Sequence, residues 1–111
     1  KSSHMLTRIV KLTFQEEKIA DFLAYFDTIN TRVSTFENCY GMRLMQDIRH
    51  PHIVFTYSNW KDENALNAYR DSELFGGVWS TIKPWFGGKP EAWSVETYFE
   101  DGPFLPNHPT N

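Results

Sequence analysis

Residues 53–60, with the sequence IVFTYSNW, carry the strongest β-strand signal in the chain. Six of the eight are β-branched or aromatic, the residue types that fit the pleated, half-buried surface of a sheet. Asp62 follows and can cap a helix, because its side chain can accept a hydrogen bond from a free backbone N–H of the first turn. That helix would carry Ala65, Leu66 and Tyr69 on one face. The stretch therefore predicts a strand that runs directly into a short amphipathic helix.

A second short helix is predicted after Ser72, which is another N-cap residue. Its apolar residues recur at steps of three and four: Leu74, Phe75, Val78, Trp79 and Ile82. Pro84 and the pair Gly87-Gly88 end this helical region, and residues 92–99 (AWSVETYF) are predicted to form the last strand. Gly76-Gly77 lies inside the helix, where glycine is costly. The pair indicates a close approach of a ligand or helix, a movable turn, or a local break without function.

Upstream of residue 53, the period of the apolar residues changes twice. Residues 6–14 and 39–46 favour strands, and residues 16–33 place apolar side chains on one face of a helix. The apolar even positions of the first strand are interrupted by one cation, Arg8. Pro51 favours a turn between the two strands that flank it. The order predicts an α+β, ferredoxin-like split β-α-β fold, whose four-stranded antiparallel sheet has both helical segments on one face.

The other face of this sheet would carry Ile9 together with either Phe55 and Tyr57 or Val54 and Trp60, depending on register. Such a face is too apolar to be left in water, and a two-fold homodimer is the simplest way to cover it. We expect the Pro-rich tail to lie across the partner, since Phe104 and Leu105 would otherwise be exposed.

Length and composition narrow the class of protein. The 111 residues fit one domain, which we assign to residues 5–100, with residues 1–4 as a tag remnant and residues 101–111 as a C-terminal tail. A net charge of −3 without a basic cluster argues against nucleic-acid binding. No apolar run approaches the roughly 20 residues of a membrane span. The single Cys39 excludes an internal disulfide, and the cytoplasm is the simplest compartment.

Residues 55–80, FTYSNWKDENALNAYRDSELFGGVWS, resemble the signature region of antibiotic biosynthesis monooxygenase domains. RIVKLTF at residues 8–14 and KPEAWSVETYF at residues 89–99 also fit that family. The resemblance implies a dimeric α+β barrel and a cofactor-independent monooxygenase that oxidises a small aromatic or quinol-like molecule with O₂. We accordingly expect neither flavin, haem nor metal. Haem-degrading relatives have an Asn on the first strand and a His on the later helix, where this chain has Val10 and Trp79. Haem degradation is therefore disfavoured, although Trp60 matches the Trp of those relatives.

Several side chains are candidates for a ligand pocket between the sheet and the helices. They are Arg8, Val10, Tyr57, Asn59, Trp60, Tyr69, Phe75 and Trp79. Each also has a purely structural interpretation: the Trp side chains can fill the core, a buried Tyr hydroxyl usually has a structural partner, and Arg8 can extend from the strand end into solvent.

No catalytic base can be assigned from the sequence. His50 and His52 lie at the start of the third strand, roughly 25 Å from Trp60 at its end, and we expect them in an exposed loop. A non-catalytic ligand-binding or stress-associated dimer, and an isomerase or lyase of the same fold, remain alternatives to the monooxygenase.

Overall fold

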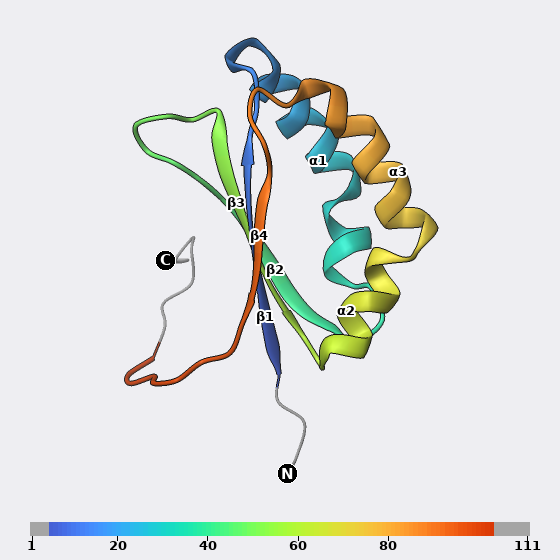
Figure 1. The fold of residues 1–111 in the computed structure, drawn as a ribbon, viewed down its shortest axis with the longest axis vertical. Helices are drawn as coiled ribbons and strands as arrows, with labels where there is room; N and C mark the ends of the chain where they lie inside the picture. The colour runs from blue at the N-terminus through green and yellow to red at the C-terminus, as the bar shows by residue number, and fades with distance from the viewer. Residues whose placement is uncertain (1–4, 104–111) are drawn as a thin grey trace, which may run out of the picture.

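The computed structural model describes residues 5–103 as one sheet covered on one face by helices (Figure 1). The strands are β1 (Leu6–Thr13), β2 (Cys39–Gln46), β3 (Ile53–Trp60) and β4 (Glu91–Val95). The helices are α1 (Ile19–Ser34), α2 (Glu63–Arg70) and α3 (Glu73–Ile82), with short 3-10 turns η1 (Glu16–Lys18) and η2 (Lys83–Trp85). All strand pairs are antiparallel, in the order β2-β3-β1-β4. The predicted ferredoxin-like α+β fold is confirmed.

The register of β3 settles which of its residues face the helices. Val54 and Trp60 are almost fully buried and pack in the core. Tyr57 is the cross-strand partner of Ile9, on the opposite face. The core face of the central strands thus carries the even-numbered residues. The second of the two alternatives left by the sequence, with Val54 and Trp60 on the uncovered face, is wrong.

Two apolar clusters hold the helices onto the sheet. The first joins β1, β3, α1 and α3 through Leu12, Phe14, Phe22, Val54 and Ile82. Its centre is an aromatic stack in which the ring centroids of Phe14 and Phe22 are 4.3 Å apart. The second cluster packs Trp60 against Ala65 and Leu66 of α2. The first cluster thus ties one end of the sheet to α1 and α3, and the second ties the other end to α2.

Both predicted helix caps are present. The Asp62 carboxylate accepts a hydrogen bond of 2.9 Å from the backbone N–H of Ala65. The Ser72 hydroxyl accepts one of 3.1 Å from Phe75 N–H. These caps satisfy N–H groups that a helix start leaves free, so the chain can end α2 and begin α3 within a few residues.

The glycine pairs have opposite environments. α3 runs unbroken through Gly76 and Gly77, so the local break considered from the sequence is wrong. A Cβ atom added at either position would meet nothing within 4 Å. At Gly87, by contrast, an added Cβ would lie 3.0 Å from backbone atoms of Phe14 and Gln15. The close approach of two backbone segments therefore requires glycine at position 87, after η2, whereas no such approach within the chain explains the glycines of α3.

The last strand is shorter than predicted: β4 ends at Val95, and residues 96–99 are not a strand. Thr7, near the start of β1, already pairs with Val95, so β1 offers almost no backbone for a longer β4 to bond. The segment after β4 instead turns away on the side of the sheet opposite the helices (Figure 1). Phe104 and Leu105, predicted to lie across a partner, are outside the described residues.

The uncovered face of the sheet carries a strip of apolar side chains among polar ones. Trp93 is 45 % exposed and Val95 is 41 % exposed, and both lie on β4 beside Ile9 and Thr7 of β1. Phe55 and Tyr57 continue the same face on β3. Within residues 5–103, no helix is long and apolar enough to cross a membrane.

Candidate ligand cavity

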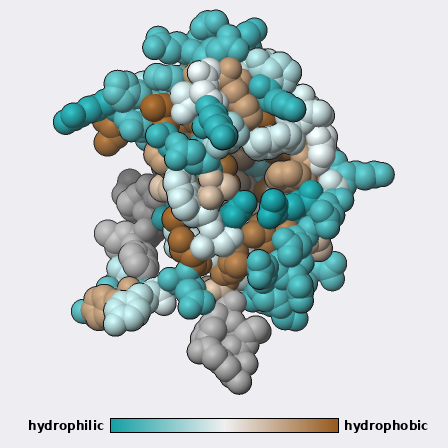
Figure 2. Space-filling model, viewed as in Figure 1, coloured by the Kyte–Doolittle hydropathy of each residue, from teal (hydrophilic) through white to brown (hydrophobic). Residues whose placement is uncertain are grey.

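A cavity of about 390 Å³ lies between the sheet and the helices. Its floor is formed by even-numbered residues of the central strands, including Arg8 and Val10 of β1 and Thr56 and Ser58 of β3. Helices α1, α2 and α3 supply most of the remaining walls, together with Met42 of β2 and residues 90–92 at the start of β4. In the space-filling view, apolar side chains are visible between the edge strand β4 and the helices (Figure 2). The volume suits a small organic molecule.

Most of the side chains proposed from the sequence line this cavity: Arg8, Val10, Trp60, Tyr69, Phe75 and Trp79. Tyr57 and Asn59 do not, because successive strand residues point to opposite faces and these two share the uncovered one. There Asn59 Oδ1 accepts a hydrogen bond of 2.7 Å from the Thr7 hydroxyl. The Arg43 guanidinium lies over the Tyr57 ring, 5.5 Å from its centroid.

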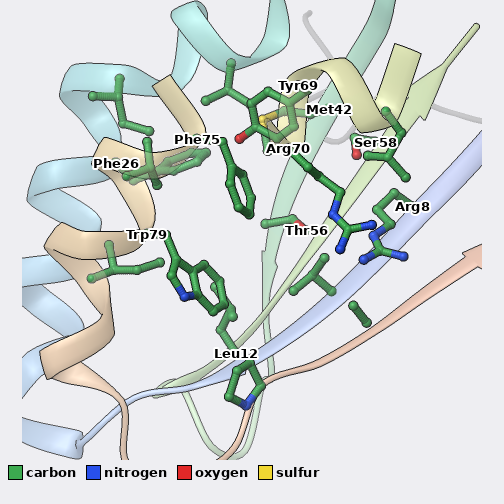
Figure 3. Close-up of a pocket in the computed structure, with 18 of the residues that line it drawn as sticks. Arg8, Leu12, Phe26, Met42, Thr56, Ser58, Tyr69, Arg70, Phe75 and Trp79 are labelled. Carbon is green, nitrogen blue, oxygen red and sulfur yellow. The ribbon is translucent and has the colours of Figure 1, made fainter. Parts of the chain in front are cut away.

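The helix side of the cavity has an aromatic wall. Phe75 and Trp79, one turn apart on α3, are nearly parallel, with an interplanar angle of 14° and centroids 5.8 Å apart. Tyr69 meets Phe75 edge to face at 5.2 Å. Figure 3 shows these rings bordering the same space. A flat ligand could stack here, since offset stacking is a favoured arrangement of aromatic rings.

Trp60 borders the cavity but is chiefly a core residue. It is 1 % exposed, and its ring stacks on Tyr69 with centroids 5.0 Å apart. Its indole N–H donates a hydrogen bond of 2.9 Å to the Ser58 hydroxyl. The polar end of Trp60 is thus already satisfied by its own strand. We infer that Trp60 supports the wall that Tyr69 and Phe75 present.

Few polar groups reach this space, and most are basic or neutral. Arg8 and Arg70 both line the cavity, as does Tyr69. Burial first, and then the charge of Arg70, lower the pKa of Arg8. Burial raises the pKa of Tyr69 to about 12, so its hydroxyl stays protonated at neutral pH. The sequence interpretation missed Arg70, Thr56 and Ser58. Strand alternation would have identified the last two once Trp60 was known to face the helices.

The remaining reactive side chains of the described part lie elsewhere. His50 and His52 flank Pro51 in the β2–β3 connection, beside a separate shallow hollow. Cys39 packs against the Trp60 cluster. Among residues 5–103, no group of three or more His, Cys, Asp or Glu side chains is placed to hold a metal ion.

The fold and the cavity define a small α+β protein with an aromatic-lined cavity between its sheet and its helices. The sequence profile described as antibiotic biosynthesis monooxygenase matches residues 5–78. The chain belongs to this family.

Solved structures agree on the fold. A protein from Nitrosomonas europaea that carries the family's name superposes with a TM-score of 0.81 at 14% identity, covering 92% of this chain and 98% of its own. Another so named, from Caulobacter crescentus CB15, has a TM-score of 0.79 at 16% identity, covering 87% and 92%. A conserved protein from Methanosarcina mazei Go1 gives 0.76 at 19% identity, covering 82% and 90%. At such identities the likeness establishes the fold alone. No protein of curated function matches the chain in sequence.

Proposed function

We propose that the protein is a monooxygenase that oxidises a small aromatic, quinol-like substrate with O₂ and without a cofactor. The observation that carries the proposal is the aromatic-walled cavity in a chain of this family. In the reaction, the ionised quinol supplies the electrons, one oxygen atom bonds to the ring and the other leaves as water. The products are a hydroxyquinone and water, so no outside reductant is needed.

The cavity suits the protein's part in such chemistry. Rings on α3 hold a flat substrate and exclude water, which strengthens every electrostatic interaction inside the site. Positive charge from Arg8 and Arg70 stabilises negative charge on the reacting oxygen. The neutral Tyr69 hydroxyl can donate a hydrogen bond to the same atom or to reduced oxygen.

The test is O₂ consumption with a series of hydroquinones, in the presence of a chelator and without added nucleotide. We expect a rate above that of buffer, and a lower rate for Trp79→Ala than for Trp79→Phe, because phenylalanine keeps an apolar ring in the wall. Tyr40→Phe, at an exposed aromatic residue of β2 outside the cavity, serves as the control. No rate above buffer with any quinol would reject the monooxygenase.

We further propose that a second copy of the chain covers the helix-free face of the sheet. The exposed Trp93 and Val95 continue an apolar strip with Ile9 and Tyr57 that is costly to leave in water. Tyr98 and Phe99, on the segment that turns away on this side, are also exposed. A closed two-fold pair buries the same patch on both copies.

A non-catalytic ligand-binding dimer is the second candidate. The observation in its favour is that, among the described residues that line the cavity, the only acidic one is Glu91, and its carboxylate is directed to Lys11 Nζ at 3.9 Å, on the uncovered face of the sheet. No histidine lines the cavity in this part of the chain. Tight binding of a quinol without O₂ consumption would favour this candidate.

A further inference from the structure

Two arginines enter one end of an otherwise largely apolar cavity. Arg8 comes from β1 and Arg70 from the last residue of α2, and Figure 3 shows both guanidinium groups directed into the same space. They are close enough for the charge of Arg70 to lower the pKa of Arg8. Two like charges side by side repel each other, and they would be stabilised by an anion between them.

Within residues 5–103, neither arginine forms a salt bridge with a carboxylate. The salt bridges found among residues 5–103 are Lys11–Glu91 and Lys18–Asp21, and neither includes an arginine. The Arg8 side chain donates a hydrogen bond of 2.9 Å to the neutral Ser94 hydroxyl on the neighbouring strand β4. Since a guanidinium has five N–H donors, this bond fixes the direction of Arg8 and leaves donors for a ligand.

The arginines and the aromatic wall border one space. Phe75 and Trp79 come from α3, whereas Arg8 rises from the sheet (Figure 3). A ligand that stacks on the rings would therefore direct one edge toward the guanidinium groups. Tyr69, which remains protonated, borders the cavity with them.

We propose that Arg8 and Arg70 together bind an anionic oxygen of the ligand, so that the cavity selects flat apolar molecules bearing a carboxylate or an ionised hydroxyl. This inference deepens the proposed function and uses the same cavity. For a quinol, binding between two cations favours the phenolate over the phenol and lowers the pKa of the bound hydroxyl. The proton then leaves to water on binding, and the site has no need of a histidine or carboxylate base.

The experiment measures binding of 2-naphthoate and of its neutral isostere 2-naphthamide by the wild-type protein. Arg70→Gln is the main variant, because Arg70 is exposed at a helix end and its loss should leave the fold intact. Arg8→Gln is the second variant. Arg32→Gln, an exposed arginine in the last turn of α1, is the matched control.

We expect wild type to bind naphthoate more tightly than naphthamide. Arg70→Gln should weaken naphthoate binding by about tenfold to about a hundredfold, the usual range for a lost hydrogen bond to a charged group, with little change for naphthamide. Arg32→Gln should change neither. A further measurement distinguishes a carboxylate from an ionised hydroxyl as the group that binds: the ionisation of 2-naphthol is followed by its absorbance. A lower pKa for bound than for free naphthol indicates that the site accepts phenolates. An unchanged pKa restricts the site to carboxylates.

Equal affinity of wild type for naphthoate and naphthamide, or no binding of either, would overturn the inference. The same holds if Arg70→Gln and Arg32→Gln bind naphthoate equally well. None of these results depends on turnover. Selective naphthoate binding with no O₂ consumption would reject the monooxygenase and leave the anion site standing, whereas O₂ consumption without this selectivity would do the reverse.

Discussion

Replacing Trp60 tests whether this residue is core or ligand wall. Its side chain is almost fully buried, stacks on Tyr69 and packs on Leu66. Trp60→Ala should lower the free energy of unfolding by about 3–5 kcal/mol, the range for deleting a large buried aromatic side chain. Trp60→Phe keeps most of the ring but removes the N–H that bonds to Ser58, whose hydroxyl is itself buried. That change should cost about 1–3 kcal/mol.

The measurement is urea unfolding followed by circular dichroism. All variants are compared at one protein concentration, because the stability of the proposed dimer would depend on concentration. Trp79→Ala is the matched control: Trp79 borders the cavity and is partly exposed, so its truncation enlarges an existing space. We expect it to cost about 2 kcal/mol. If Trp60→Ala stayed within about 1 kcal/mol of wild type while Trp79→Ala lost more, the assignment of the two residues would be reversed.

Gly76→Ala should raise the free energy of unfolding by up to about 1 kcal/mol, because the added Cβ meets nothing within 4 Å. Gly87→Ala should lower the free energy of unfolding, because the added Cβ would crowd the backbone of Phe14 and Gln15. Urea unfolding in which Gly87→Ala is the more stable of the two variants would contradict the packing described. The Tyr69 hydroxyl should titrate near pH 12 in the folded protein, against about 10 in the unfolded chain. Its contribution to the free energy of unfolding is therefore complete below pH ~10 and is lost as the pH rises from about 10 to about 12. Phenolate absorbance from all tyrosines below pH ~11 would refute this. If the proposed dimer forms, Trp93→Glu should convert it into a monomer, as measured by light scattering, and an unchanged mass would argue against the proposed interface.

The elements could be predicted from the sequence because each has a clear period or cap. The three-and-four spacing along residues 19–33 and the cap residues Asp62 and Ser72 led to the correct helices. The end of β4 could not be predicted, since residues 96–99 have strand-like side chains. Only the backbone available on β1 determines where pairing stops.

The site was harder to predict for a related reason. The sequence IVFTYSNW is apolar or aromatic at both odd and even positions, so it does not reveal which face is buried. Tyr57 and Asn59 were grouped with Trp60 although they lie on the other face. Arg70 looks like an ordinary solvated residue at a helix end. Only the packing of α2 against the sheet brings its long side chain beside Arg8.

We propose that the protein oxidises an aromatic substrate in this cavity directly with O₂. The most direct measurement supplies isotopically labelled O₂ to the purified protein with a hydroquinone and a chelator, and determines the mass of the quinone product. The proposed function predicts one labelled oxygen atom per hydroxyquinone, at a rate that falls in Trp79→Ala and Arg70→Gln. Product without label, or labelled product formed equally fast by both variants, would contradict it.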